Sequence, residues 1–204
     1  MIITEIKKIG KGERYSIYLD GIFNCSLEAE ILVRYKLKLG QEIDHDSLKN
    51  IKLENGKISA FSRALTYIEK GLRTQKGVRD YLKEKGFLQE SIDDALKKLA
   101  EYGYINDKYF AESYINTYCH KKGRIKLKYD LISKGVPANI IEEALENLDE
   151  EASFATCQNI YEKYTKNKEM NAKMKAKTYA YLMSKGFESD IIKSVMEQEY
   201  ESWN

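Results

Sequence analysis

The chain has 204 residues, 43% hydrophobic and 32% charged, with a formal net charge of +2 and a single proline. This length allows one large domain or two to three small ones, and the apolar content excludes a disordered chain. A net charge this close to zero says nothing about binding partners, so any indication of a partner must come from how the charges are distributed along the chain. Few prolines and many charges favour helices with exposed charged faces.

Sorting signals and redox chemistry are not apparent in the chain. It has no run of about 18 apolar residues, and its first residues lack the basic-then-apolar order of a signal peptide. Cys25, Cys119 and Cys157 are widely spaced and form no CxxC pair, which fits reduced thiols in a reducing compartment. We therefore expect a cytoplasmic protein without a membrane segment.

The N-terminal segment is predicted to be a small β-hairpin or meander followed by helix. IITEIKKI alternates, and RYSIYLDGIFNCSL carries two β-rich runs around Asp20-Gly21, a dipeptide typical of tight hairpin turns. Ser26 is expected to cap a helix that Gly40 closes. A second helix is predicted to reach Gly71, with Asn55-Gly56 as a weak point that allows a break or a kink.

The remaining chain repeats itself about every fifty residues. YLKEKGF, DLISKGV and YLMSKGF each place glycine after lysine and before an apolar residue, and successive glycines lie 49 and 51 residues apart. Glycine after a helix adopts the left-handed conformation, the apolar residue folds back onto the last turn, and lysine suits the negative end of the helix dipole. These turns, each between a second and a third helix, are Gly86 and Phe87, Gly135 and Val136, and Gly186 and Phe187.

The predicted fold is mainly α, with three tandem three-helix repeats in an elongated curved array behind the β-containing leader. We expect caps for the third helices at Ser91, Asn139 and Asp190. The predicted domains are residues 1–58 for the leader and 59–104, 105–149 and 150–204 for the three repeats.

Catalytic patterns are missing from the sequence. It lacks a GxxxxGK[ST] phosphate loop, and its only histidines are His45 and His120. Cys119-His120 is a poor metal or nucleophile pair, because adjacent helical residues point about 100° apart. The acidic pairs Asp93-Asp94 and Glu142-Glu143 are interpreted as solvated first turns that suit the helix dipole. We predict a protein that is not an enzyme and has no metal or cofactor.

Charge is segregated along the chain. Residues 70–85 contain six basic and two acidic residues, and residues 119–136 and 163–177 each contain six basic residues and one acidic residue. In contrast, residues 138–151 contain six acidic residues and no basic one. If the repeats stack in one orientation, their second helices form a basic stripe suited to a phosphate backbone or an acidic protein groove. Tyr81, Tyr129 and Tyr179 would add stacking. The alternative is that the lysines merely coat soluble helices and the tyrosines are core.

Three segments together resemble the RecX regulatory proteins of bacteria. They are RALTYIEKGLRTQKGVRDYLKEKGF, GYINDKYFAESYI and GRIKLKYDLISKGVPANIIEEAL. The second segment, the junction of the first two repeats, is the most specific, through Gly103, Tyr104, Asp107, Phe110 and Ala111. The resemblance covers about residues 60–197, and the leader looks like the extension of longer members.

The resemblance implies a regulator, most often an inhibitor, of the RecA recombinase. Such a protein binds the groove of the RecA filament on single-stranded DNA and modulates its ATPase activity and strand exchange. It also contacts single- or double-stranded DNA. Nothing such as a long heptad run requires a dimer, so a monomer is expected. The alternatives are a stand-alone DNA-binding repeat protein or a helical scaffold for an unrelated protein.

Candidate binding residues follow from the basic stripe and the resemblance together. For the filament or nucleic acid they are Arg73, Lys76, Arg79, Lys83, Lys121, Lys122, Arg124, Lys126, Lys128, Lys173, Lys175 and Lys177. Tyr104 and Phe110 are expected to hold the first two repeats together. Reversing Arg124, Lys126 and Lys128 to Glu is predicted to weaken filament binding without unfolding the chain.

Overall fold

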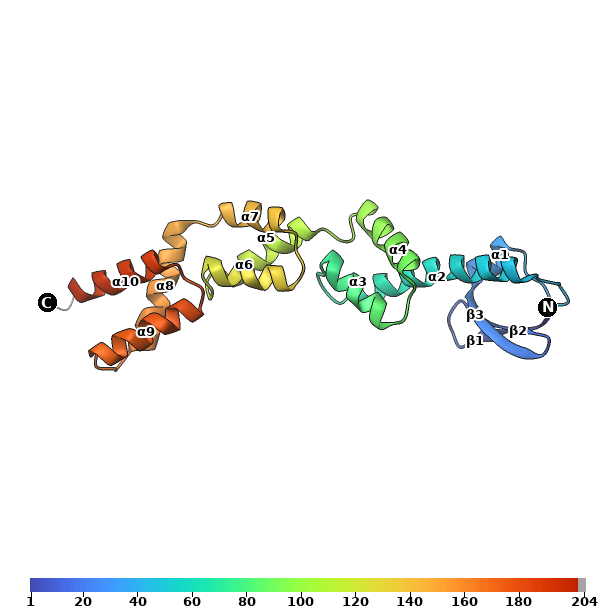
Figure 1. Cartoon of the computed structure of the whole chain (residues 1–204), viewed down its shortest axis with the longest axis horizontal. Helices are drawn as coiled ribbons and strands as arrows, with labels where there is room; N and C mark the ends of the chain where they lie inside the picture. Colours follow the sequence, from blue (N-terminus) through green and yellow to red (C-terminus); the bar gives the residue numbers. More distant parts are fainter. Residues whose placement is uncertain (202–204) are drawn as a thin grey trace. The chain divides into compact units, whose positions relative to one another are not determined.

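The computed structural model describes residues 1–201 of the chain, and it describes side chains as far as Gln198. These residues form two compact units. Unit 1 holds residues 1–72 and 77–105, and unit 2 holds residues 73–76 and the chain from 106 onward. Over the described residues the fold is mainly helical, with one small antiparallel sheet near the N-terminus (Figure 1). This confirms the predicted fold class.

The leader in unit 1 is a three-stranded meander. Its strands are β1 (Ile3–Ile9), β2 (Arg14–Leu19) and β3 (Ile22–Glu28), paired antiparallel in the order β1-β2-β3. The turn between β2 and β3 uses positive φ at both Asp20 (49°) and Gly21 (82°), as the Asp-Gly pair predicts. One face of the sheet is buried under two helices, α1 (Ala29–Arg34) and α2 (His45–Ile68).

Helix α1 is shorter than predicted. Ser26 lies within β3, where it pairs with Ser16, so it does not cap the helix. The helix ends at Arg34 rather than near Gly40, because Lys36 takes a left-handed φ of 50° and the Leu37 N–H returns to the Leu32 carbonyl. The missed stop signal is thus a lysine in a conformation that usually favours glycine.

Helix α2 runs through Asn55-Gly56 without a break, and it crosses the predicted boundary at residue 58. Asn55 accepts a hydrogen bond from the Glu28 N–H (2.7 Å) and donates to the Ser26 carbonyl, so it ties the helix to the end of β3. A Cβ on Gly56 would lie 2.8 Å from Ser91 Oγ. This glycine therefore serves the close approach of the next repeat helix rather than a turn.

The first repeat combines the second half of α2 with α3 (Gln75–Glu84) and α4 (Gln89–Glu101). Its core is fully buried and aliphatic, with Ala64, Leu82, Ile92 and Leu99 all at 0% exposure. These residues recur at helical spacing within each helix, which is why the pattern predicts an amphipathic bundle.

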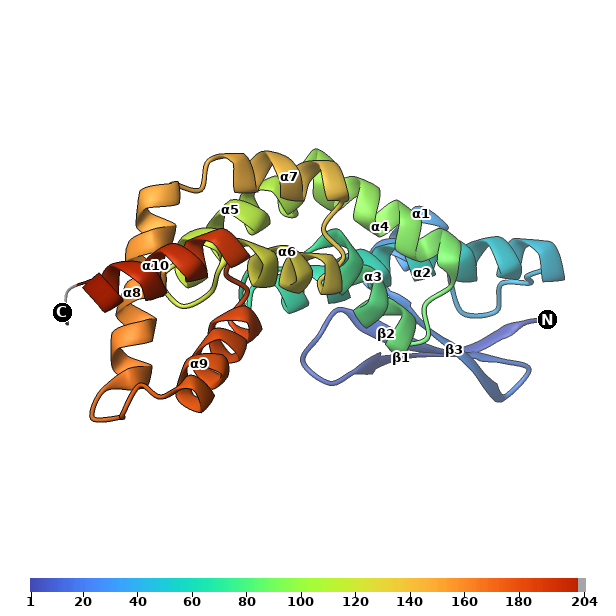
Figure 2. The same ribbon diagram turned by 60° about the vertical axis from the view of Figure 1, so that its left-hand side comes forward.

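The second and third repeats lie in unit 2. The second consists of α5 (Asp107–Tyr118), α6 (Arg124–Ser133) and α7 (Ala138–Glu146), and the third of α8 (Glu150–Thr165), α9 (Ala172–Ser184) and α10 (Ser189–Glu201). Each has its own core, around Leu127 and Leu131 in one case and around Leu182 and Phe187 in the other. Figure 2 shows α9 and α10 as a helical hairpin against α8.

The third helix of every repeat starts earlier than predicted. Helices α4, α7 and α10 begin at Gln89, Ala138 and Ser189, so the predicted caps lie inside the first turn. The preceding residues Leu88 and Pro137 are extended and make no side-chain capping bond. The next helix therefore begins directly after the Schellman turn, with two residues between the turn glycine and the helix. Ser91 is buried against α2 and does not cap the helix.

Candidate nucleic-acid interface

The three lysine-glycine turns have one backbone geometry. Gly86, Gly135 and Gly186 have φ values of +80°, +78° and +86°. The next residue donates its N–H to the carbonyl five positions back, at 3.2 Å for Phe87, 3.1 Å for Val136 and 3.4 Å for Phe187. This is the bond of a Schellman cap, so the turn is built the same way in each repeat.

The lysine before each glycine lies over a tyrosine ring. Lys85 lies 5.4 Å from the Tyr81 centroid, Lys134 lies 5.3 Å from that of Tyr114, and Lys185 lies 5.1 Å from that of Tyr181. In the first and third repeats the tyrosine also stacks on one from the first helix, with centroids 4.0 Å and 4.1 Å apart. The lysine thus helps to join the first and second helices of its repeat.

The three turn glycines differ in what faces them. A Cβ on Gly86 would meet nothing within 4 Å, and one on Gly135 would meet the side chain of Lys76 at 2.1 Å. Gly186 is buried, and its Cβ would lie 2.3 Å from the backbone nitrogen of Lys126. Here the start of α6 docks on the turn after α9, because the Gly123 N–H donates to the Lys185 carbonyl (2.9 Å).

The lysine-glycine turn of the second repeat, at Gly135, receives residues 73–76 in a similar way. Thr74 Oγ1 donates to the Lys134 carbonyl at 2.7 Å, and Lys76 covers Gly135. The Gln75 N–H donates to Asp107 Oδ1 at 2.8 Å. Two of the predicted site residues, Lys76 and Lys126, therefore lie against turn glycines.

Two further predicted binding residues form ion pairs between the second and third helices of their repeats. Arg79 Nη1 lies 2.6 Å from Asp93 Oδ1, and Lys128 bonds to Glu142. Hydrogen bonds from Gln89 and then Arg79 lower the pKa of Asp93, and the bond from Lys128 lowers that of Glu142. In both pairs the basic residue lies seven positions before the turn glycine of its repeat, and the acidic residue lies seven positions after that glycine. This shared spacing was the signal that the sequence interpretation missed.

Lys122 belongs to a half-buried polar cluster rather than to an open surface. Its Nζ donates to Asp130 Oδ2 (2.7 Å) and to the Tyr114 hydroxyl (3.1 Å), and it lies 4.5 Å from the Tyr118 ring centroid. The bond to Asp130 raises the pKa of Lys122. Burial works to raise the pKa of Asp130, but bonds from Lys122 and Tyr114 outweigh it and lower the pKa. The cluster therefore ties α5 to α6.

The lowered pKa of Asp130 predicts a pH-dependent contribution to stability. This contribution is present above the unfolded-state pKa of about 3.9 and is lost as the pH falls through the lower folded-state value. Asp130→Asn is expected to lower the free energy of unfolding by about 1–2 kcal/mol at pH 7. Urea denaturation from pH 7 down to pH 2 should show the difference from the wild type shrinking below about pH 4. A difference that is constant with pH would contradict the ionised pair.

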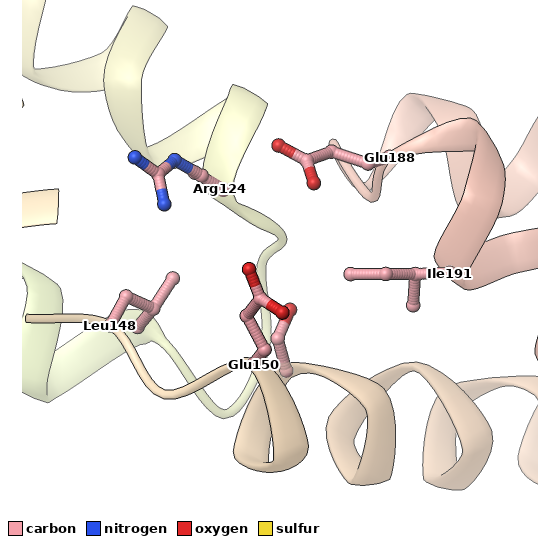
Figure 3. A pocket seen from close by; sticks show the side chains of 6 residues that line it. Arg124, Leu148, Glu150, Glu188 and Ile191 are labelled. Atoms are coloured by element: carbon pink, nitrogen blue, oxygen red, sulfur yellow. The ribbon is translucent and has the colours of Figure 1, made fainter. Parts of the chain in front are cut away.

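Arg124 lines a small cleft in unit 2 together with acidic residues (Figure 3). Glu150 at the start of α8 and Glu188 before α10 share this cleft with Leu148 and Ile191. Its space of about 20 Å³ is enough for about one water molecule and too small for a nucleotide. The two carboxylates make Arg124 a poor candidate for a phosphate contact at this place.

The other candidates divide by exposure. Arg73 and Lys175 are half-buried, and each makes contacts within the protein. Lys83, Lys121, Lys173 and Lys177 are exposed, and none of these four lysines belongs to an ion pair among residues 1–201. The structure therefore separates lysines that face solvent from basic residues that bind other parts of the chain.

The junction residues are placed within their own units. Gly103 ends α4 with φ +70°, and Tyr104 is 56% exposed with its ring 5.9 Å from that of Tyr102. Phe110 is half-buried and packs on the core of the second repeat. Truncating Phe110 should thus cost less than the 3–5 kcal/mol typical of a fully buried phenylalanine. That Tyr104 and Phe110 hold two repeats together stays a prediction.

The tyrosines expected near the basic stripe have different surroundings. Tyr81 stacks on Tyr67, and the Tyr179 hydroxyl lies 3.0 Å from Ser189 Oγ. Tyr129 alone of the three is mostly exposed, at 65%. Tyr129 is therefore the one with a ring face open to a nucleic-acid base.

Two kinds of structure are absent from residues 1–201, a metal-binding cluster and a membrane-spanning helix. No group of three or more His, Cys, Asp or Glu side chains there is arranged to hold a metal ion. Among residues 1–201, no helix combines the length and the apolar character needed to cross a bilayer.

Family models match the chain in consecutive segments. The model of the regulatory protein RecX N-terminal domain matches residues 1–44. The models of the first, second and third three-helix domains of RecX match residues 60–99, 106–145 and 150–196.

Similar proteins and structures share the same name. Proteins called regulatory protein RecX are 36% identical in Clostridium beijerinckii, covering 97% of this chain and 94% of theirs, and 35% identical in Bacillus velezensis, covering 98% and 78%. A crystal structure of regulatory protein RecX aligns with a TM-score of 0.72 at 26% identity over 96% of this chain and 98% of that one. RecX from Lactobacillus salivarius aligns with a TM-score of 0.66 at 29% identity over 71% and 97%.

Proposed function

Because the chain belongs to the RecX family of regulatory proteins, we propose that it regulates the RecA recombinase by binding the filament that RecA forms on single-stranded DNA. The proposed effect is inhibition of ATP hydrolysis and strand exchange. The carrying observation is that the RecX N-terminal domain model and the models of the first, second and third three-helix domains all match one chain, in that order. We propose further that it acts in the cytoplasm, as a monomer and without catalysis of its own.

The solvent-facing lysines support binding to a polyanionic assembly. Lys83, Lys121, Lys173 and Lys177 are distributed over all three repeats. Charges at the rim of an interface speed up association and contribute affinity that salt weakens. A filament offers DNA phosphates and acidic protein surface along its length, so a chain with lysines in several repeats can engage it at several points.

The binding test uses Lys83 and Lys121, two exposed lysines that form no ion pair within residues 1–201. Reversing Arg124, Lys126 and Lys128 would also remove the Lys128–Glu142 pair and bring new carboxylates to Asp130, Glu150 and Glu188. Lys83→Glu/Lys121→Glu leaves those contacts intact. We expect this double variant to bind RecA filaments about tenfold more weakly at low salt, a loss of about 1.4 kcal/mol.

Co-sedimentation with RecA filaments on single-stranded DNA measures this affinity. Lys49→Glu/Lys52→Glu is the matched control, since both lysines are exposed on α2 of the leader. The control should bind like the wild type. A wild-type protein that stays in the supernatant at every concentration would refute filament binding, and equal affinities of the two double variants would remove Lys83 and Lys121 from the interface.

A further inference from the structure

Residues 73–76 show how a lysine-glycine turn receives the start of a helix. Thr74 directly precedes α3, and its Oγ1 donates to the Lys134 carbonyl at 2.7 Å. Lys76 is the second residue of α3, and its methylene chain covers Gly135, where a Cβ would overlap it. The docking elements are therefore a hydrogen-bond donor just before the helix and a lysine in its first turn.

The start of α6 docks on the Gly186 turn with the same elements. Gly123 directly precedes α6, and its N–H donates to the Lys185 carbonyl at 2.9 Å. The Ile125 N–H donates to the Gly186 carbonyl at 3.0 Å, and Lys126 covers this glycine. In both contacts the positive end of one helix dipole meets the negative end of another. The chain thus makes this kind of contact twice.

The turn of the first repeat receives no such helix in the part of the chain that the structure describes. Lys85 and Gly86 are exposed, and a Cβ on Gly86 would meet nothing within 4 Å. The Lys85 carbonyl accepts no hydrogen bond from the described residues. Phe87 is only half-buried, whereas its counterparts Val136 and Phe187 are 5% and 1% exposed. The first turn therefore has the backbone geometry of the other two without their occupant.

The start of α9 carries the docking elements and is itself exposed. Asn171 directly precedes α9, as Thr74 precedes α3, and Lys173 is its second residue, as Lys76 is in α3. Both Asn171 and Lys173 are exposed. The Asn171 Oδ1 accepts the Met174 N–H at 2.9 Å, and its Nδ2 donates to no group among the described residues. A donor and a lysine are thus available at this helix start.

We infer that the start of α9 in one copy of the chain docks on the Lys85-Gly86 turn of a second copy. In this contact Asn171 Nδ2 donates to the Lys85 carbonyl, in the role that Thr74 has at the second repeat. The methylene chain of Lys173 covers Gly86. A second copy is the occupant because the chain presents both halves of a contact that it already makes twice. The association is head to tail, since each copy contributes a different surface.

The contact joins two helix ends, so it is small and weak. Interfaces of small area are typical of transient encounters, and we expect a dissociation constant of about 0.1–1 mM. The chain is therefore monomeric at micromolar concentration. On a filament, neighbouring copies would be held at effective concentrations of about this size and would continue the contact from one copy to the next. That consequence rests on the proposed function, whereas the contact itself does not.

Sedimentation equilibrium of the full chain between about 10 µM and 1 mM, without RecA or DNA, tests the contact. The weight-average mass of the wild type should rise with concentration. Asn171→Asp keeps an oxygen that caps α9 but lacks the amide donor, so it should weaken association about tenfold or more. Asn171→Thr supplies a capping hydroxyl that also donates, as Thr74 does, and should associate like the wild type.

Gly86→Asn removes the other half of the contact. Asparagine is tolerated in the left-handed conformation, and its side chain occupies the space above the turn. Gly86→Asn alone and Asn171→Asp alone should both sediment as single chains. Their equimolar mixture should associate, because one variant has an intact α9 start and the other an intact Gly86 turn.

The outcomes separate this inference from the proposed function, because RecA is absent from the experiment. A wild-type mass that stays that of one chain up to about 1 mM would overturn the contact, whether or not the protein binds filaments. Association of Asn171→Asp equal to that of the wild type would assign the association to another surface and overturn it too. So would a mixture of Asn171→Asp and Gly86→Asn that remains monomeric. Restored association in that mixture, together with the wild-type behaviour of Asn171→Thr, is the result expected.

Discussion

Gly186→Ala is expected to lower the free energy of unfolding of the third repeat by about 3–5 kcal/mol, whereas Gly86→Ala lowers that of the first repeat by about 1–2 kcal/mol. In both variants the alanine must adopt a left-handed backbone conformation, which destabilises the folded repeat by about 1–2 kcal/mol. Only Gly186 also has the backbone of Lys126 within 2.3 Å of the new Cβ. Relieving that clash breaks the bonds from Gly123 and Ile125 to this turn, at about 1 kcal/mol each.

The buried thiol of Cys157 reports this effect in the third repeat. Its side chain is 0% exposed, and burial raises its pKa to about 11, so it should react with thiol reagents only when the repeat opens. In a Cys25→Ser/Cys119→Ser background, labelling of Cys157 should be much faster for Gly186→Ala than for the parent. Gly86→Ala should leave the labelling rate unchanged.

Gly123→Ala separates close approach from backbone conformation. Gly123 has an ordinary φ of −75°, yet its Cβ would lie 2.3 Å from the Gly186 carbonyl oxygen. We expect Gly123→Ala to accelerate labelling of Cys157 as well, although it carries no left-handed penalty. If Gly123→Ala labelled Cys157 as slowly as the parent and the control Gly86→Ala do, the docking of α6 on the turn after α9 would contribute nothing to stability.

Phe187→Ala is expected to cost about 3–5 kcal/mol of unfolding free energy in the third repeat. Phe187 is 1% exposed and lies among Leu182, Ile192 and Val195, so its removal leaves a cavity that the aliphatic neighbours fill only in part. Phe87 is the equivalent residue in the first repeat, but it is only half-buried. Phe87→Ala should therefore cost about 2 kcal/mol or less.

Urea denaturation followed by circular dichroism compares the two phenylalanine variants. The stability change is taken from the shift of the midpoint at constant slope. The labelling rate of Cys157 should rise for Phe187→Ala and not for Phe87→Ala. Equal shifts for both variants would show that the third core is packed no more tightly than the first.

Much of the fold follows from local signals in the sequence. The fifty-residue period, the lysine-glycine turns and the Asp20-Gly21 hairpin each have one dominant physical cause, so they predict the repeats and the meander. The prediction of a weak point at Asn55-Gly56 was wrong, because both residues serve tertiary contacts, to β3 and to Ser91. The prediction of the third-helix caps was wrong because the turn geometry places the helix start before Ser91, Asn139 and Asp190.

The candidate site was harder to predict than the fold. A count of lysines cannot show that Arg79 and Lys128 have acidic partners on the next helix, since the pairing depends on the tertiary register of two helices. Nor does it show that Lys122 is held by Asp130 and Tyr114. The spacing of base, glycine and acid, repeated in two of the three copies, would have predicted the ion pairs.

The rate of ATP hydrolysis by RecA on single-stranded DNA, titrated with this protein, distinguishes regulation of the filament from binding to DNA alone. Binding of the protein to bare DNA should be measured in the same buffer. We expect the rate to fall at protein concentrations that leave bare DNA mostly unbound, because the filament itself is recognised. An unchanged rate, or a fall that only follows the occupancy of bare DNA, would contradict regulation of RecA through its filament.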